Sequence, residues 1–182
     1  MADHSAAIDF VLANEGGLSE NPRDAGGVTN HGISLRFLRS IPPERYRVFT
    51  LFEPITPDTI RHLTIPQARL IYQFEFWLKA PFSSIKNQRI ANYVFDCAVH
   101  HGIADGIKIL QRATWDVMGQ YRFIDDDGVM GRMTLGAMDV VGVEGLIHAL
   151  PAERASHCRV EAIRRVENKE FLNGWLKRCY RI

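Results

Sequence analysis

Polar and apolar residues follow a helical period over most of the 182-residue chain. Near the N-terminus, Ile8, Val11 and Leu12 have the three- and four-residue spacing of a buried helix face, and Glu15 is the next member of that stripe. This pattern predicts a helix over residues 5–15 with Glu15 on its buried side. Two glycines follow, and we expect them to end the helix because glycine accepts the left-handed conformation after a C-cap.

The segment 21–34 has a different pattern, in which turn-forming residues separate short β-forming stretches. Val28, Thr29 and Ile33 favour strands, and the polar and glycine residues around them favour tight turns. We therefore expect one small antiparallel hairpin directly after the first helix. Ser34 is in the right place to cap a short helix over residues 35–39.

Helical periodicity returns after residue 64 and continues to the end of the chain. Thr64 and Gln67 form a capping-box pattern, which marks the start of a helix. The pattern predicts helices over residues 65–78, 88–101, 105–118, 133–140, 151–168 and 170–180. The predicted fold class is mainly α with a small β part, in one compact unit with a cleft between two lobes.

Composition narrows the possible functions. The net charge is only +1, so the chain has no strong global field with which to capture nucleic acid. Residues 151–182 nevertheless hold eight Lys and Arg residues against four Glu. A solvated helix face is the favoured explanation for this excess, and a weak attraction to an anionic polymer or surface is the alternative.

The cysteines and the N-terminus indicate where the protein is made. Cys97, Cys158 and Cys179 are widely spaced, which is typical of reduced, buried thiols rather than of a disulfide framework. The N-terminus lacks the pattern of a secretory signal, and no apolar run approaches the ~18 residues of a membrane span. We expect synthesis in the cytoplasm, no metal and no cofactor, since no zinc-type His/Cys spacing occurs.

The opening segment combines residue types suited to breaking a glycosidic bond. Desolvation raises the pKa of a carboxyl on an apolar helix face, so we expect Glu15 to hold a proton and to act as a general acid. Asp24 lies in a polar loop and is expected to stay ionised, while the Thr29 hydroxyl can hold a water. Each residue alone is more often a surface or turn residue, but the combined spacing across a helix–hairpin junction is far more specific.

These residues resemble a known family. The stretch is similar to the signature of the glycoside hydrolase family 108 N-acetylmuramidases, lysozyme-like enzymes of which many are from phages. The matching positions are Glu15-Gly16-Gly17, Asn21-Pro22, Asp24, Gly26-Gly27, Thr29-Asn30 and Gly32-Ile33. Later segments resemble the family's helices and its associated peptidoglycan-binding region, including Phe95-Asp96, Asp127-Gly128 and Gly174-Trp175 with Arg178. One departure is Leu18, where the family usually has Tyr.

The resemblance implies hydrolysis of the β-1,4 bond between N-acetylmuramic acid and N-acetylglucosamine in peptidoglycan. Glu15 matches the family's catalytic acid, and the resemblance implies that Asp24 and Thr29 are the other catalytic residues. We expect substrate contacts from Gly26, Gly27, Asn30, Tyr72 and Asp96. The expected division is a lysozyme-like catalytic region over residues 1–88 and a peptidoglycan-binding region over residues 89–182.

Two other functions stay open at this point. The basic C-terminal segment also suits a non-catalytic peptidoglycan-binding or secretion-accessory protein. A lytic transglycosylase likewise uses a single acid, but it leaves a 1,6-anhydro product. For the favoured muramidase we expect a monomer of the endolysin type that reaches the cell wall with the help of a partner such as a holin.

Overall fold

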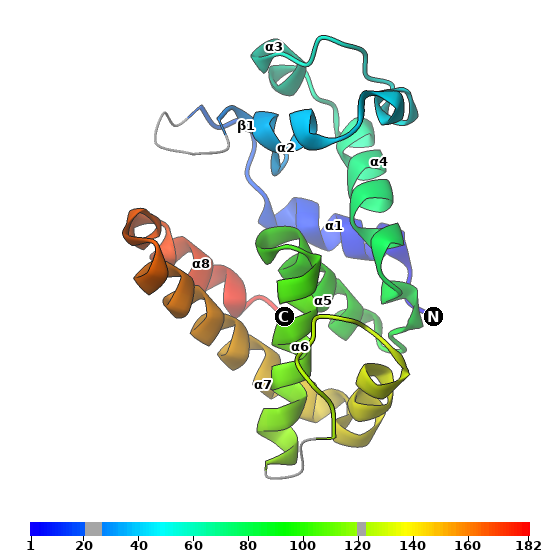
Figure 1. The fold of residues 1–182 in the computed structure, drawn as a ribbon, viewed down its shortest axis with the longest axis vertical. Coiled ribbons are helices and arrows are strands. Elements are labelled where there is room, and N and C mark those ends of the chain that lie inside the picture. The colour runs from blue at the N-terminus through cyan, green and yellow to red at the C-terminus, as the bar shows by residue number, and fades with distance from the viewer. Residues whose placement is uncertain (21–26, 120–122) are drawn as a thin grey trace.

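The computed structural model describes residues 1–20, 27–119 and 123–182 (Figure 1). Helices predominate, and a two-stranded antiparallel sheet follows the first of them. The described elements are α1 (His4–Asn14), β1 (Thr29–Asn30), β2 (Ile33–Ser34), α2 (Leu35–Ser40), η1 (Pro43–Phe49), α3 (Pro57–Arg61), α4 (Ile65–Glu75), η2 (Trp77–Lys79), η3 (Phe82–Ser84), α5 (Gln88–His101), α6 (Ile103–Met118), α7 (Arg132–Arg164), η4 (Val166–Glu170) and α8 (Leu172–Cys179). The predicted mainly α fold with a small β part is therefore confirmed.

The first helix ends one residue earlier than predicted and for a different reason. Asp3 caps its N-terminus by accepting a hydrogen bond from the amide of Ser5 at 2.6 Å. Glu15 is the C-cap, with an extended backbone at φ −78° and ψ 148°. The expectation of left-handed glycines was wrong, because neither Gly16 nor Gly17 has a positive φ. The chain instead leaves α1 in an extended conformation that begins at Glu15.

The hairpin is shorter than the segment that predicted it. Thr29 pairs with Ser34 and Asn30 with Ile33, so two residues form the turn between the strands. These are His31, with φ 50°, and a glycine with φ 77°, and two positive φ values are typical of the turns that suit the twist of a hairpin. Ser34 then caps α2 by accepting a hydrogen bond from the amide of Phe37, as predicted.

The capping box predicted at Thr64 and Gln67 is present at the start of α4. This helix ends at Glu75, and the 3-10 helix η2 covers most of the rest of the predicted span. The connection before it contains η1 and α3, which the hydrophobic pattern did not predict because each is only a few residues long. Helix α5 has the predicted bounds, and Gly102 follows it with φ 91°.

Helix α7 corrects the sequence prediction most strongly. It spans 33 residues, but Gly142 is non-helical, with φ 72° and ψ 173°, so two helical segments meet there. The second segment includes Pro151, which was predicted to begin a helix but lies inside one. Proline is normally found at the first turn of a helix, which explains the error.

Part of α7 is apolar enough to span a membrane by length and composition alone. Only 28% of that 18-residue window is buried inside the molecule. The break at Gly142 interrupts the helix that contains it, so α7 as a whole is not one continuous rod.

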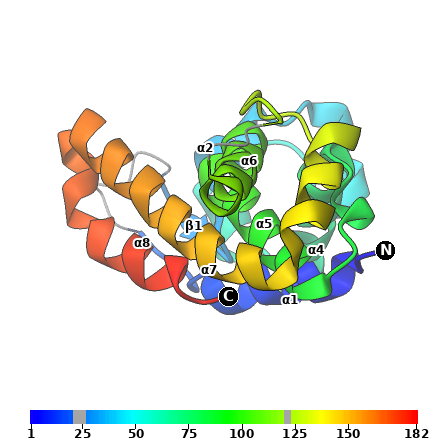
Figure 2. The same cartoon turned by 90° about the horizontal axis from the view of Figure 1, so that it is seen from below.

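Two apolar clusters of different size hold these elements together. The large one contains buried residues from most of the described elements between Ala2 and Leu150. The small one contains Ala155, Cys158 and Cys179, with Leu172, Trp175 and Leu176 packed against it. It attaches α8 to the second half of α7, and the two helices project together from the body of the molecule (Figure 2).

Candidate functional site

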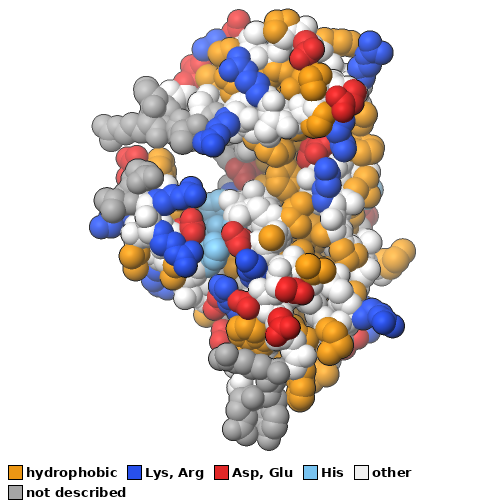
Figure 3. Space-filling model, in the orientation of Figure 1, with side chains coloured by type: hydrophobic (Ala, Val, Ile, Leu, Met, Phe, Trp, Pro, Cys, Tyr) orange, Lys and Arg blue, Asp and Glu red, His pale blue; other side chains and the backbone are white. Residues whose placement is uncertain are grey.

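A surface pocket of about 510 Å³ lies between the C-terminal end of α1, the hairpin turn, α5 and α8. In Figure 3 the surface is hollowed between the hairpin end of the molecule and the C-terminal helices, and Lys and Arg side chains gather over the helices. The described residues lining the pocket come from α1, the hairpin turn, α5 and α8: Asn14, Glu15, Gly32, Val99, His100, Gly174, Trp175, Lys177, Arg178 and Arg181. Residues from both ends of the sequence thus form a single site.

Glu15 lies at this pocket with its side chain 17% exposed. The hairpin turn can approach the side chain of Glu15 this closely only because the turn residue that faces it, Gly32, has no side chain. A Cβ on Gly32 would lie 2.6 Å from Cδ of Glu15 and 2.3 Å from the hydroxyl oxygen of Tyr72. Gly32 also has φ 77°, a conformation that other residues rarely adopt. The turn therefore confines the carboxyl of Glu15 to one side of the pocket.

Tyr72 of α4 is fully buried beneath this turn. Its hydroxyl donates a hydrogen bond to the carbonyl of His31 at 2.8 Å, which fixes the turn against α4. Burial, and then the nearby charge of Glu15, raise the pKa of Tyr72 well above its ordinary value, so the phenol keeps its proton. In this structure Tyr72 supports the turn rather than presenting its ring to solvent.

Arg178 of α8 connects Glu15 to a buried ionic network. Its Nη2 donates to Oε1 of Glu15 at 2.7 Å and to Oδ1 of Asp96 at 2.7 Å, and its Nε donates to Oδ2 of Asp96 at 3.0 Å. Asp96 also accepts a hydrogen bond from Nη1 of Arg154 at 2.8 Å, and both of these side chains are fully buried. Two guanidinium groups and two carboxylates therefore balance each other beneath the pocket.

The charges in this network favour the ionised form of Asp96. Burial alone raises the pKa of Asp96, but hydrogen bonds and charge from Arg178 and Arg154 outweigh it, so the pKa lies below its ordinary value. Asp96 is thus a permanent anion that anchors both arginines, and it is covered from solvent. The sequence prediction placed Glu15 on a buried face but did not include the cation that now contacts it.

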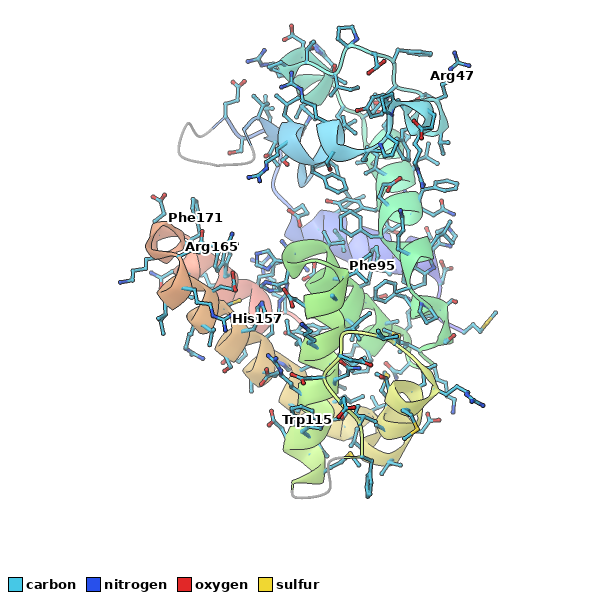
Figure 4. The ribbon with its side chains drawn as sticks, in the orientation of Figure 1. Arg47, Phe95, Trp115, His157, Arg165 and Phe171 are labelled. Atoms are coloured by element: carbon cyan, nitrogen blue, oxygen red, sulfur yellow. The ribbon has the colours of Figure 1, made fainter. Side chains whose placement is uncertain are left out.

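The small cluster explains why Arg178 reaches Glu15. Cys158 and Cys179 are free thiols with their sulfur atoms 3.7 Å apart, in contact between α7 and α8. Trp175 packs edge-on against His100, with the ring centroids 5.5 Å apart. Figure 4 places Phe171 and Arg165 at the outer turn between the two helices and His157 on the inner side of α7. The pair of helices is thereby folded back so that the end of α8 faces α1.

Three histidines lie between α5 and these helices. The ring of His101 is 4.1 Å from that of His100 and 4.7 Å from that of His157, between centroids. Burial, followed by the charges of Arg178 and Arg154, lowers the pKa of His100 well below its ordinary value. Burial, followed by the neighbouring His100 and Arg154, lowers the pKa of His101. Burial also lowers the pKa of His157, against the opposing charges of Asp105 and Glu161. Neutral imidazoles therefore lie at the contact between α5 and α7, beside the two arginines.

The structure places the other predicted residues as follows. Thr29 donates its hydroxyl hydrogen to the carbonyl of Gly27 at 3.2 Å and does not line the pocket of Glu15. Asn30 is buried, and its amide donates to the carbonyl of Ile60 at 3.1 Å, which ties the hairpin to α3. Asp24 and Gly26 lie outside the described residues.

Two important residues were not among the predicted site residues. Gly32 and Arg178 both belong to the motifs that carried the family resemblance, but nothing in their local sequence indicates contact with Glu15. The contact of Arg178 with Glu15 joins positions 163 residues apart. No cluster of three or more His, Cys, Asp or Glu side chains suited to a metal occurs within residues 1–20, 27–119 and 123–182.

Comparisons with known proteins cover nearly the whole chain. The family described as glycosyl hydrolase 108 matches residues 8–102, and a predicted peptidoglycan domain matches residues 105–180. Among solved structures, SagA of Brucella abortus is similar, with 26% sequence identity and a TM-score of 0.73. That match covers 98% of this chain and 90% of SagA. The comparison with curated proteins gave no match.

Proposed function

The chain belongs to glycosyl hydrolase family 108, and from that premise we propose that it is an N-acetylmuramidase. The family and the peptidoglycan domain support a glycoside hydrolase that acts on the cell wall. The bond in our proposal is the β-1,4 linkage between N-acetylmuramic acid and N-acetylglucosamine. The observation that carries the proposal is the position of Glu15, whose partly exposed carboxyl lines a pocket large enough for part of a glycan.

In the proposed reaction, Glu15 donates a proton to the glycosidic oxygen while the bond from that oxygen to the anomeric carbon breaks. Asp24 stabilises the positive charge that develops on the sugar or helps to activate a water, and Thr29 positions that water. The water forms the new bond to the anomeric carbon and loses a proton to a carboxylate. The products are an alcohol on one sugar and a reducing end on the other.

The ion pair between Glu15 and Arg178 adds a condition to this reaction. A general acid must direct its carboxyl at the glycosidic oxygen, whereas Oε1 of Glu15 accepts a hydrogen bond from Arg178 in this structure. We therefore infer that bound substrate weakens this contact before the proton is transferred. If Arg178 loses its contact with Glu15, its guanidinium still has an anionic partner, because Asp96 accepts two of its hydrogen bonds.

The first experiment measures the release of reducing ends from purified peptidoglycan. Glu15→Gln keeps the size of the side chain but cannot donate a carboxyl proton, so we expect loss of activity by at least ~100-fold. The matched control is Glu44→Gln on η1, an exposed glutamate outside the pocket, which should leave the rate unchanged. Urea unfolding of both variants checks that the fold is retained. A Glu15→Gln variant with full activity contradicts the proposal.

A lytic transglycosylase is the second candidate. Glu15 is the only carboxylate among the described residues lining the pocket, and such enzymes use a single acid. Mass spectrometry of the released fragments distinguishes the two reactions, because hydrolysis adds one water and transglycosylation leaves a 1,6-anhydro sugar. An anhydro product would replace the muramidase proposal while keeping Glu15 as the acid.

We propose an endolysin-type role for the muramidase, with the protein acting as a monomer on the wall after release from the cytoplasm. A holin or a similar partner is the route to the wall in that case. Lysis of cells by the protein supplied from inside, with and without a membrane-permeabilising partner, tests this role.

A further inference from the structure

The pocket of Glu15 carries more positive charge than its own carboxylates balance. Lys177, Arg178 and Arg181 line it, whereas Glu15 is the only acidic residue of the lining that the structure describes. Arg178 is already matched by Glu15 and by Asp96 beneath the pocket. Lys177 and Arg181 are exposed and form no ion pair within the described part of the chain. Two cations are therefore available at the mouth of the pocket.

The pocket wall beside these two cations has further features that suit a ligand. Arg181 is held in place by a hydrogen bond from its Nη1 to Oδ1 of Asn14 at 3.3 Å, so it points across the pocket towards the end of α1. Trp175 adds a partly buried aromatic ring to the same wall. His100 does not add charge, because burial and the neighbouring arginines lower its pKa well below the ordinary value. The pocket combines cations, an aromatic ring and one acid.

We propose that this pocket is a subsite for a carboxylate of the glycan substrate, with Lys177 and Arg181 as its principal ligands. The inference rests on the proposed function, because it assigns an acidic substituent of N-acetylmuramic acid or of its attached peptide to the space beside Glu15. Ammonium and guanidinium groups form charge-assisted hydrogen bonds with carboxylates, and a partly enclosed pocket strengthens them.

An anion bound here also has a direct effect on Glu15. It competes for the hydrogen bond that Arg178 donates to the carboxyl of Glu15 at 2.7 Å. When that bond is lost, Oε1 of Glu15 is free to contact the glycosidic oxygen instead. The subsite therefore couples recognition of an acidic sugar to preparation of the catalytic residue.

A simpler explanation exists for basic residues in this position. Lysine and arginine near the C-terminus of a helix interact favourably with its dipole, and Lys177 lies in the last turn of α8. That explanation needs no ligand and predicts no preference between neutral and acidic glycans. A general attraction of the basic surface for the wall is another alternative, and it depends on net charge rather than on position.

The test compares two charge-matched double variants in the Glu15→Gln background, which prevents turnover. Lys177→Ala/Arg181→Ala removes both cations of the subsite. Arg47→Ala/Arg132→Ala removes two exposed arginines from η1 and from the start of α7, outside the pocket, and Figure 4 shows Arg47 at the far end of the molecule from α8. Both variants lower the net charge equally. Arg178 is left unchanged because its removal would also take away one of the two arginines that pair with the buried carboxylate of Asp96.

The probes are a soluble oligosaccharide that contains N-acetylmuramic acid, the same molecule with its carboxylate amidated, and N-acetylglucosamine oligomers of equal length. Calorimetry measures each dissociation constant at low and at physiological salt. We expect the acidic probe to bind roughly tenfold more tightly than the amidated one, and we expect Lys177→Ala/Arg181→Ala to abolish that preference. The control variant should keep the preference.

Equal loss of preference in the two double variants overturns the inference in favour of general charge attraction. Equal affinity of the Glu15→Gln protein, with both cations present, for the acidic and amidated probes also overturns it. Failure of the proposed function gives a different result: the parent protein with Glu15 intact releases no fragments from peptidoglycan, even though the preference for the acidic probe is present. The two outcomes are measured on different samples and cannot be confused.

Discussion

The two sides of the pocket are built in different ways. On the N-terminal side, Glu15 is held by the end of α1 and the hairpin turn, and α1 packs into the large core. On the C-terminal side, Arg178 belongs to α8, which is attached through the small cluster around Cys158 and Cys179. The acid therefore stands at the end of a helix that packs into the larger of the two clusters. Its cationic partner stands on a helix with few buried contacts.

This difference indicates which side is free to move. Regions with few buried apolar contacts open at a lower free energy than the core does. A substrate that separates Arg178 from Glu15 needs to displace only the less firmly packed side, while the acid stays in place. Asp96 is the common anchor, because it is buried on α5 and binds Arg178 directly.

The largest expected effect comes from removing this anchor. Asp96→Ala leaves Arg154 fully buried without a carboxylate partner, and breaking a buried ion pair in this way costs about 3–5 kcal/mol of the free energy of unfolding. Urea unfolding measures it. Asp139→Ala is the control, because its partner Lys86 is exposed and such a pair contributes at most about 1 kcal/mol. Similar losses in the two variants contradict the assigned role of Asp96.

The second prediction disturbs the N-terminal side alone. Gly32→Ala places a Cβ 2.6 Å from Cδ of Glu15 in a backbone with φ 77°, so either the turn or the carboxyl must shift. We expect a loss of about 1–3 kcal/mol in stability and roughly 100-fold in activity, because small displacements of a catalytic group are costly. Gly17→Ala is the control, since a Cβ there has nothing within 4 Å. An active Gly32→Ala variant contradicts close confinement of Glu15.

Local sequence patterns predicted most of the N-terminal side. The apolar stripe through Ile8 and Val11 located Glu15, and the serine cap and the capping box at Thr64 are present as expected. These features depend on neighbours a few residues apart, so the sequence records them directly. The predicted end of a helix at residue 140 lies two residues before the break at Gly142, but the second helical segment begins before Pro151, which the pattern did not predict.

The C-terminal side could not be predicted in the same way. Arg178 reads as one more base on an amphipathic helix, and its contact with Glu15 depends on how α7 and α8 fold back over α5. A periodic pattern shows which face of a helix is apolar but not which distant helix covers it. The expectation of an acid on an apolar helix face was therefore incomplete, since the cationic partner of Glu15 comes from a helix near the opposite end of the sequence.

The third prediction compares the two cores with the same substitution. Cys158→Ala and Cys97→Ala each remove one fully buried sulfur, from the small cluster and from the large core respectively. We expect each to cost about 1 kcal/mol of stability. Hydrogen exchange separates them: amides of α8 should exchange faster only in Cys158→Ala. Equal protection of α8 in both variants contradicts a weaker attachment on the C-terminal side.

The smallest expected effect is on the pH dependence of stability, and it reports on the same side. His100 packs against His101, and burial, followed by the charges of Arg178, Arg154 and His157, lowers the pKa of His100 in the folded protein. Below the ordinary pKa of about 6.5, His100 binds a proton in the unfolded chain but stays neutral in the folded protein. Stability is therefore complete above that value and falls as the pH drops towards the folded pKa.

His100→Gln removes one such group, so the free energy of unfolding should decline less steeply between about pH 6.5 and 5. At pH ~6 the stability lost relative to neutral pH should be smaller by about 0.8 kcal/mol than in the unmodified protein. Urea unfolding at a series of pH values measures the slope. His62→Gln, an exposed histidine that follows α3, is the control for the loss of an imidazole. If His100→Gln leaves the slope unchanged, His100 is not held neutral against Arg178. The packing of α8 over α5 would then be looser than the contact of Trp175 with His100 implies.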